Sequence, residues 1–224
     1  VHEADVVVLA TPVRVILRLL PQVAPLMPPG ALLMDVGSTK ARIVAEMAHL
    51  PSHIHPLGGH PMCGKETSGI AAADPALYRG CTFVLTPLPR TPDEALALGR
   101  ALVETVGARP LLLDPERHDR LVAVISHLPY LLACSLVGAA VDIAKTDPTV
   151  WKVTASGFHD TSRLAASDVT MMLDILLTNQ EAVLEALNAC EVHLHRLAAL
   201  IQAGDEQNLR AALTVLRSKR KLAL

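Results

Sequence analysis

The chain has 224 residues, of which 51% are apolar and only 2% aromatic, and its formal net charge is −2 at pH 7. This length suits one large domain or two small ones, and the scattered lysines and arginines argue against nucleic-acid binding. The four cysteines lie far apart with no Cys-x-x-Cys pair, which argues against a disulfide framework or a zinc ribbon. Neither a signal peptide nor an uninterrupted apolar run of about twenty residues is found, so we expect a cytoplasmic protein.

The first part of the chain alternates predicted strands with predicted helices. The apolar run 5–10 predicts a strand buried on both faces, and Thr11-Pro12 ends it where a helix begins. A second strand at 31–36 runs into Asp35-Val-Gly-Ser-Thr-Lys40 and another helix. This order implies parallel strands with right-handed crossovers, and ligands of such sheets bind beyond the carboxyl ends of the strands. Both strand ends are therefore expected to face one crevice.

The segment from Leu57 to Gly69 reads Leu-Gly-Gly-His-Pro-Met-Cys-Gly-Lys-Glu-Thr-Ser-Gly. Its paired glycines predict a turn, and Pro61 favours an extended conformation for His60, which would present the imidazole to a ligand. Histidine has a reference pKa of about 6.5 and can take a proton near neutral pH. A lone histidine in a loop is more often structural, but a predicted strand at 52–57 delivers His60 to the same sheet edge. We therefore interpret His60 as a candidate base.

Two further strands are predicted at 81–86 and 110–113, the second at a sheet edge because it contains a proline. The helix between them spans 93–106 and ends at Gly107. Strand signals vanish after Asp114-Pro115. Residues 1–114 are therefore predicted to form an α/β domain with a partial Rossmann-like parallel sheet.

The second half of the chain carries only helical patterns. Apolar spacing predicts a helix over 116–145 that bends at Pro129. It predicts two more over 168–203 and 206–217, separated by Gly204. Residues 115–224 are therefore predicted to form an all-α helical domain. Many aliphatic residues on few helices suggest that this domain meets a second subunit and serves dimerisation.

Polar residues of the helical half complete a candidate site. Ser156-Gly-Phe-His-Asp-Thr-Ser-Arg163 predicts an interhelical loop, and an arginine such as Arg163 can grip a carboxylate with two hydrogen bonds. Across a cleft from it would lie Thr11, Ser38 and His60. The set contains a base, hydroxyls and a carboxylate clamp, and histidine and cysteine spacing gives no regular metal site. It fits proton removal from a hydroxyl with hydride transfer to a nicotinamide.

At this point the chain resembles a known family. Gly58-Gly-His-Pro-Met62, followed by Glu66 and Gly69, is similar to the hallmark of the prephenate and arogenate dehydrogenases. Three further segments resemble that family's motifs in the same order: Asp35-Val-Gly-Ser-Thr-Lys40, Ser126-His-Leu-Pro129 and Ser156-Gly-Phe-His-Asp-Thr-Ser-Arg163. The resemblance spans nearly the whole chain. It implies a homodimer that carries out oxidative decarboxylation in tyrosine biosynthesis, with prephenate or arogenate as substrate and NAD or NADP as cofactor.

The resemblance also implies roles for individual residues. His60 would accept or hydrogen-bond the ring hydroxyl of the substrate, and Ser38 would orient both His60 and the nicotinamide. Arg163 would clamp a substrate carboxylate. Four further residues would shape the substrate pocket: His127, Tyr130, Glu66 and Ser156. The cofactor would be contacted by Ser38 and by three other residues: Thr11, Pro12 and Asp35. No metal is implied.

One family feature is missing from the sequence. No Gly-x-Gly-x-x-Gly turn, which holds the pyrophosphate at a helix N-terminus, is present. We therefore expect the chain to lack the N-terminal part of its dinucleotide-binding domain and to bind dinucleotide poorly. Two alternatives stay open: a catalytically silent dimerising fragment, or another hydroxyacid dehydrogenase with a helical second domain. The second would need a catalytic lysine, and Lys145 and Lys152 lie in no comparable motif.

Overall fold

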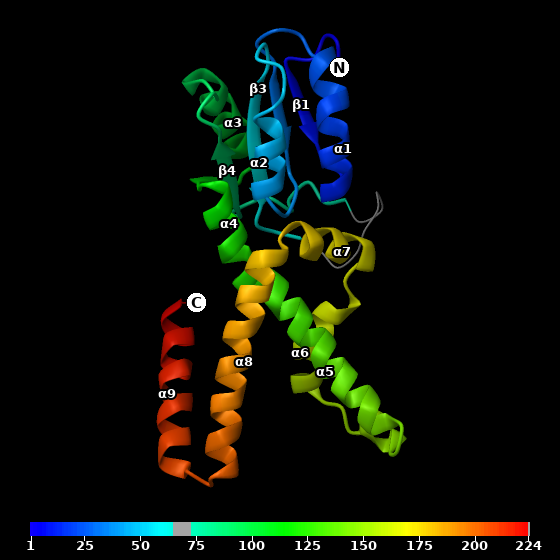
Figure 1. Cartoon of the computed structure of the whole chain (residues 1–224), viewed down its shortest axis with the longest axis vertical. Coiled ribbons are helices and arrows are strands. Elements are labelled where there is room, and N and C mark those ends of the chain that lie inside the picture. Colours follow the sequence, from blue (N-terminus) through cyan, green and yellow to red (C-terminus); the bar gives the residue numbers. More distant parts are fainter. Residues whose placement is uncertain (65–72, 224) are drawn as a thin grey trace. The chain divides into compact units, whose positions relative to one another are not determined.

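The computed structural model describes residues 1–64 and 73–223 of the chain. These residues form two compact units, Val1–Val183 and Leu184–Leu224. The first unit contains a mixed α/β layer and several helices (Figure 1). The second contains most of one long helix and the C-terminal helix.

A five-stranded sheet organises the first unit. Its strands lie in sequence order: β1 (Val6–Leu9), β2 (Leu32–Asp35), β3 (His55–Pro61), β4 (Thr82–Pro87) and β5 (Arg109–Leu112). β1, β2 and β3 run parallel, as the strand–helix–strand pattern predicts, and β4 runs parallel to β5. β3 and β4 pair antiparallel, so the sheet is mixed. The prediction of a Rossmann-like sheet with helical crossovers is confirmed for its first three strands.

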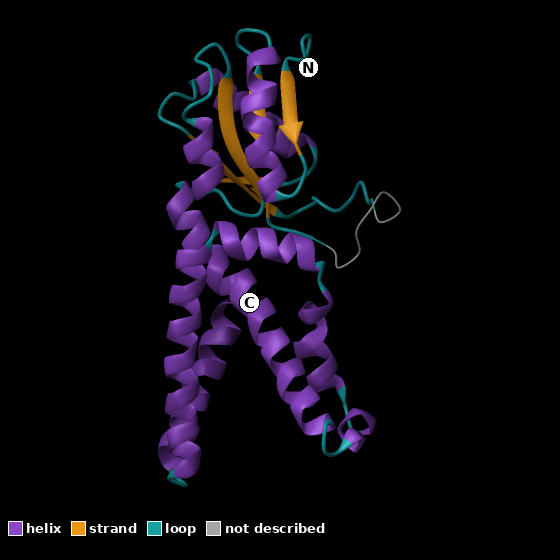
Figure 2. Cartoon of the chain, turned by 45° about the vertical axis from the view of Figure 1, so that its right-hand side comes forward, coloured by secondary structure: helices purple, strands orange, loops and turns teal. Residues whose placement is uncertain are grey.

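Helices cover both faces of this sheet (Figure 2). α1 (Val13–Val23) and α2 (Ala41–Met47) pack on one face, and α3 (Asp93–Thr105) packs on the other. Side chains alternate between the two faces along β2, and the core is therefore divided in two. Leu33 packs with α1 and α2, whereas Leu32 and Met34 pack on the side of α3. All three of these side chains are buried.

The outer strand β1 is less buried than its sequence predicts. The apolar run was expected to be covered on both faces, yet Val8 is 48% exposed and only Leu9 is buried. The reason is topological: β1 pairs only with β2 and therefore lies at the edge of the sheet. The inner strand β2, with neighbours on both sides, is buried throughout.

The paired glycines belong to a strand and not to a turn, so the predicted turn is wrong. Gly58 and Gly59 lie within β3, opposite Thr86 and Leu85 of β4. A Cβ atom on Gly59 would lie 2.6 Å from the carbonyl oxygen of Asp35, and one on Gly58 would lie 2.0 Å from the hydroxyl of Thr86. The glycines therefore allow β3 to approach its neighbours closely.

Substitution of Gly59 tests this account. Gly59→Ala should destabilise the protein by about 1–3 kcal/mol, because the new methyl group meets fixed backbone. Gly138→Ala is the matched control: Gly138 lies in a helix with open space around it, where alanine should add about 0.5–1 kcal/mol. Urea unfolding measures both, and equal effects at the two positions would contradict the steric argument.

The helical part of the chain begins where the sequence predicts. Asp114 caps α4 (Pro115–Val122) by accepting a hydrogen bond from the backbone N–H of Arg117. The helix continues through a π-helical segment (Ala123–His127) into α5 (Leu128–Ala144). Pro129 has no N–H to give to the preceding turn, and the wider π turn before it absorbs this missing bond.

Two helical predictions are wrong in detail. The stretch 168–203 forms two helices, α7 (Val169–Thr178) and α8 (Gln180–Gln202), because the chain departs from helical geometry at Asn179. The segment predicted as an interhelical loop forms α6 (Ser156–Ser162), followed by the 3-10 turn Arg163–Ala166. The remaining elements are the 3-10 turns Ala24–Leu26 and Pro148–Lys152 and the last helix, α9 (Glu206–Ala223).

The continuous helical stretch Pro115–Ala144 is long and apolar enough to cross a membrane, judged by length and composition alone. Its most apolar window has a mean hydropathy of 1.9, and 28% of that window is buried. The sequence prediction that no such span exists is therefore incomplete. It missed the stretch because polar residues such as Ser126, His127 and Ser135 interrupt the apolar run, although the mean hydropathy stays high.

Candidate functional site

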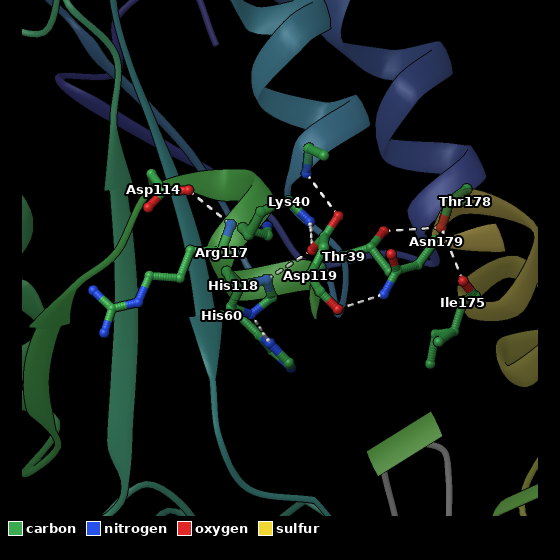
Figure 3. Close-up of polar contacts among 12 residues, drawn as sticks. Thr39, Lys40, His60, Asp114, Arg117, His118, Asp119, Ile175, Thr178 and Asn179 are labelled. Atoms are coloured by element: carbon green, nitrogen blue, oxygen red, sulfur yellow. Dashed lines mark hydrogen bonds and ion pairs between the residues drawn. The ribbon is translucent and has the colours of Figure 1, made fainter. Parts of the chain in front are cut away.

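His60 stands near the carboxyl end of β3 and contacts a second histidine. Its Nδ1 atom lies 2.8 Å from Nε2 of His118, at the fourth position of α4 (Figure 3). The Nδ1 atom of His118 lies 2.8 Å from Oδ1 of Asp119. Both residues of this His118–Asp119 pair are buried. The other ring nitrogen of His60, Nε2, has no hydrogen-bond partner within residues 1–64 and 73–223.

Asp119 is in turn held by backbone. The N–H groups of Lys40 and Ala41 donate to its two carboxylate oxygens at 2.7 and 2.9 Å. These donors lie where β2 leads into α2. The contacts therefore fix the start of the helical half against the carboxyl end of β2, which places His118 beside His60.

A buried ion pair lies behind this network. The Lys40 ammonium pairs with the Asp35 carboxylate and donates to the carbonyl oxygen of Gly59 at 2.6 Å; both ionic side chains are fully buried. Asp35 also accepts hydrogen bonds from the backbone N–H groups of Gly37 and Gly59, at 2.8 and 3.1 Å. Burial lowers the pKa of Lys40, and the charge of Asp35 opposes this effect. The Asp35 carboxylate is fully engaged inside the protein, and its contact with the cofactor stays a prediction.

His127 occupies the π-helical segment and faces α7. The side-chain amide nitrogen of Asn179 lies 3.3 Å from Nδ1 of His127 and donates to the backbone carbonyl of Asp119 at 2.8 Å. Burial lowers the pKa of His127 to about 4, an effect that Asp119 opposes. His127 is therefore neutral at physiological pH.

The same setting keeps His60 neutral. Its pKa lies well below 6.5, first because of burial and then because of the positive charges that Lys40, His118 and His127 carry or can acquire. A neutral imidazole can accept a proton or a hydrogen bond, whereas an imidazolium cannot. The geometry therefore presents His60 as an acceptor.

The low pKa of His127 predicts a pH-dependent stability. The unfolded imidazole takes up its proton near pH 6.5 but the folded one only near pH 4, so acid favours the unfolded state in this window. The His127 contribution is fully present above pH 6.5 and falls by about 3 kcal/mol as the pH reaches 4. Urea unfolding at both pH values should show that His127→Gln removes most of this loss while His55→Gln does not. An unchanged loss in His127→Gln would contradict the assignment.

The other predicted site residues are distributed as follows. Thr11 and Pro12 are exposed between β1 and α1, and the half-buried Ser38 follows β2, so these three stand at neighbouring carboxyl ends as predicted. Tyr130 is half-buried in the first turn of α5. Ser156 and Arg163 are exposed on the α6 segment and the following 3-10 turn, both of which pack along α5. Glu66 lies outside the described residues.

Sequence reasoning missed four members of this site: Lys40, His118, Asp119 and Asn179. The motif Asp35–Lys40 contained Lys40, but no role followed from it. His118-Asp119 is 58 residues from His60, and no spacing rule joins them. The only available signal was the pairing of a histidine with an acid directly after the Asp114-Pro115 boundary.

Comparison with known families covers nearly the whole chain. The model described as "Prephenate dehydrogenase, nucleotide-binding domain" matches residues 1–112. The model described as "Prephenate dehydrogenase, dimerization domain" matches residues 114–215. The first match ends at residue 112 and the second begins at Asp114, where the sequence changes from strand to helix patterns.

Individual relatives agree with these matches. The chain is 38% identical over 209 residues to prephenate dehydrogenase of Lactococcus lactis, covering 92% of this chain and 57% of that protein. It is 33% identical over 207 residues to cyclohexadienyl dehydrogenase of Zymomonas mobilis, covering 92% of this chain and 70% of that one. The chain thus spans a little more than half the length of the lactococcal relative.

Two solved structures share the fold. Prephenate dehydrogenase of Aquifex aeolicus in complex with hydroxyphenyl propionate and NAD+ superimposes with a TM-score of 0.92 at 32% identity, covering 98% of this chain and 77% of that one. Arogenate dehydrogenase of Synechocystis gives a TM-score of 0.86 at 32% identity, covering 100% of this chain and 80% of that one. Both likenesses extend over the sheet and the helices that carry the site.

Proposed function

Because this chain belongs to the prephenate dehydrogenase family, we propose that its site serves NAD(P)-dependent oxidative decarboxylation in tyrosine biosynthesis. The substrate is prephenate, which yields 4-hydroxyphenylpyruvate, or arogenate, which yields tyrosine. One observation carries the proposal: His60 is held through Nδ1 at the carboxyl end of β3, and its Nε2 atom has no hydrogen-bond partner among residues 1–64 and 73–223. This is the atom that a hydroxyl group would donate to.

In this reaction the protein mainly positions and polarises. As the carbon that bears the ring hydroxyl loses hydride, its oxygen gains carbonyl character and its proton becomes more acidic. His60 Nε2 accepts that proton or its hydrogen bond and returns it when loss of carbon dioxide makes the ring aromatic, so no net proton remains on the enzyme. Aromatisation supplies the driving force, and a positioned base contributes about 10²–10⁴-fold in such steps.

The residues at the strand ends suit the nicotinamide part of a dinucleotide. Thr11, Pro12 and Ser38 stand at the carboxyl ends of two adjacent parallel strands, which is where open α/β sheets bind nucleotides. When bound, the nicotinamide supplies the hydride acceptor. The exposed hydroxyl of Thr11 and the half-buried hydroxyl of Ser38 would hydrogen-bond to it, and Ser38 would also orient His60.

The helical half would hold the substrate carboxylates. Arg163 would clamp one of them with a bidentate pair of hydrogen bonds, and Ser156 and Tyr130 would line the pocket with His127. Glu66 is proposed for the same pocket on the family motif alone. These roles follow from the family motifs and from the packing of the α6 segment along α5.

We further propose a division into a dinucleotide-binding domain, residues 1–114, and a helical substrate and dimerisation domain, residues 115–224. The two family matches support a boundary near Asp114. Apolar side chains exposed on the helices support a homodimer, among them Ile125 at 65%, Val169 at 62% and Leu177 at 49% exposure. If a second subunit covers these side chains, the apolar stretch Pro115–Ala144 needs no membrane around it. We therefore propose a cytoplasmic dimer and not a membrane-spanning helix. Light scattering should therefore give twice the chain mass, and a monomer would refute the dimer.

A substrate panel tests the proposed function. Formation of NADH or NADPH is followed at fixed enzyme concentration with prephenate, with arogenate and with a simple 3-hydroxyacid. The proposal predicts turnover of one of the first two substrates and none of the third. Turnover of the 3-hydroxyacid alone would identify another kind of dehydrogenase, and binding of neither cofactor nor substrate would identify a silent dimerising chain.

A further inference from the structure

We infer that His118 and Asp119 are positioning residues that hold His60 in the tautomer with its proton on Nδ1 and its lone pair on Nε2. The inference rests on the proposed role of His60 as the proton acceptor. It adds a chemical function to two buried residues that sequence motifs did not single out. It follows from which atoms in the network can donate and which can only accept.

The assignment starts from the carboxylate. The backbone N–H groups of Lys40 and Ala41 can only donate, and they contact Oδ1 and Oδ2 of Asp119 at 2.7 and 2.9 Å. Asp119 is therefore an acceptor at both oxygens. Nδ1 of His118 lies 2.8 Å from the same Oδ1 atom, so His118 must carry its proton on Nδ1.

The consequence passes to His60. A neutral His118 with its proton on Nδ1 has a lone pair on Nε2. That Nε2 atom lies 2.8 Å from Nδ1 of His60, so His60 must donate from Nδ1. The lone pair of His60 is then on Nε2, the nitrogen that can face a ligand. The opposite tautomer would place two lone pairs against each other.

The neighbouring histidine is fixed in the opposite tautomer. Asn179 donates its amide N–H to the backbone carbonyl of Asp119 at 2.8 Å, which identifies the amide nitrogen because a carbonyl only accepts. The same NH₂ group lies 3.3 Å from Nδ1 of His127. Nδ1 of His127 is thus an acceptor and its proton is on Nε2. The network offers one histidine as acceptor and one as donor.

This arrangement also explains why the pair is buried. A solvated imidazole exchanges between its two tautomers, whereas His118 is 0% and Asp119 3% exposed, and each of their side-chain nitrogen and oxygen atoms has a partner. The cost of burying the Asp119 charge is offset by its three N–H donors. If His118 and Asp119 served packing alone, the contact between His118 Nε2 and His60 Nδ1 would not be needed.

Nitrogen-15 NMR of the histidine side chains tests the assignment on this chain without any substrate. The ring nitrogens of a neutral imidazole differ strongly in shift according to which one is protonated. At pH 7.5 His60 should show a protonated Nδ1 and an unprotonated Nε2, and His127 should show the reverse. A protonated Nε2 on His60 would overturn the inference, whatever the activity of the chain.

Two variants then separate positioning from packing. His118→Leu cannot accept a hydrogen bond, so His60 should lose its fixed tautomer and kcat should fall by about 10²-fold, with unchanged cofactor affinity. His118→Gln keeps an acceptor near the former Nε2 atom and should restore the His60 tautomer and most of kcat. If both variants lose kcat alike while the His60 spectrum stays as in the native chain, His118 serves packing only. If His118→Leu does not fold, the native spectrum decides alone.

A second inference comes from the register of two strands. Pro61 of β3 is opposite Phe83 of β4, and the N–H of Met62 donates to the carbonyl of Thr82 at 2.8 Å. Continued past the end of both strands, this register places Cys63 opposite Cys81. Both cysteines are half-buried, and the Cys81 thiol donates to the backbone carbonyl of Leu77 at 3.4 Å. Facing residues of an antiparallel pair have Cα atoms about 4.5–5.5 Å apart, and disulfides span about 4.4–6.8 Å.

The geometry points to Cys63 and Cys81 as a disulfide site three residues from His60. Exchange with a low-molecular-weight disulfide such as oxidised glutathione balances the reaction: the two thiols lose two electrons and two protons, and two glutathione thiols form. Burial and the neighbouring Cys81 raise the pKa of Cys63 to about 11. Little thiolate is therefore present at neutral pH, and exchange of this pair with the oxidant is slow.

Mass spectrometry tests this site. After incubation of the native protein with oxidised glutathione, peptide mapping should find Cys63 joined to Cys81, with Cys134 and Cys190 still free. Cys81→Ser should abolish the link and leave a glutathione adduct on Cys63 or a free thiol. Unmodified thiols, or only glutathione adducts, in the native sequence would overturn the inference.

Discussion

His60→Asn should abolish nearly all turnover. Loss of a positioned base costs about 10²–10⁴-fold, and asparagine offers no nitrogen lone pair to take the proton from the ring hydroxyl. The variant should still fold, because the amide can donate to Nε2 of His118 in place of the imidazole Nδ1–H. Cofactor affinity should be unchanged, since the strand ends that carry Thr11 and Ser38 are not altered.

Steady-state formation of NADH or NADPH and a calorimetric titration with the cofactor measure the two effects separately. His55→Asn is the matched control, because His55 begins the same strand but makes no contact in the His60 network described above. It should retain full activity. Full activity in His60→Asn would remove His60 from the mechanism, and equal losses in both variants would indicate damage to β3 as a whole.

Lys40→Met should cause the largest loss of stability, about 3–5 kcal/mol, because removal of one partner leaves a buried charge without compensation. The Lys40 ammonium and the Asp35 carboxylate are both fully buried, and the carbonyl of Gly59 would lose its donor as well. Since these groups support β3 beside His60, activity should fall with stability.

Urea unfolding compares this variant with Lys145→Met. Lys145 pairs with Asp142 at the surface, where the two side chains are 70% and 72% exposed, and such pairs contribute only about 0–1 kcal/mol. A double variant, Lys40→Met with Asp35→Asn, should recover part of the loss, because no lone charge remains and the amide oxygen can still accept a hydrogen bond from the backbone N–H of Gly37 or Gly59. Similar losses at Lys40 and Lys145, or no recovery in the double variant, would refute the buried-pair account.

Local patterns predicted the elements better than their surroundings. The apolar runs located β1 and β2, Gly107 marked the end of α3, and Asp114-Pro115 marked the start of the helices, because each of these signals acts over a few residues. The exposure of β1 did not follow from its apolar run, since burial depends on which strands lie beside it. Gly58 and Gly59 were interpreted as turn residues, whereas the structure uses them for close approach to Asp35 and Thr86.

The site shows the same division. His60 stood out because its neighbours Gly59 and Pro61 constrain it locally. His118, Asp119 and Asn179 did not, because their roles exist only after the helical half docks against the end of β2. The break at Asn179 was equally hidden: apolar spacing continues through it, and it is the contacts of its amide with Asp119 and His127 that favour the non-helical conformation.

The most direct test of the central claim is the stoichiometry of the proposed oxidative decarboxylation. Carbon dioxide released from prephenate or arogenate labelled at the ring carboxylate is measured alongside the NADH or NADPH formed. We predict equal amounts of the two products, and neither product in His60→Asn. Formation of reduced cofactor without carbon dioxide would show a simple hydroxyl oxidation and would contradict the assignment of oxidative decarboxylation to the His60 site.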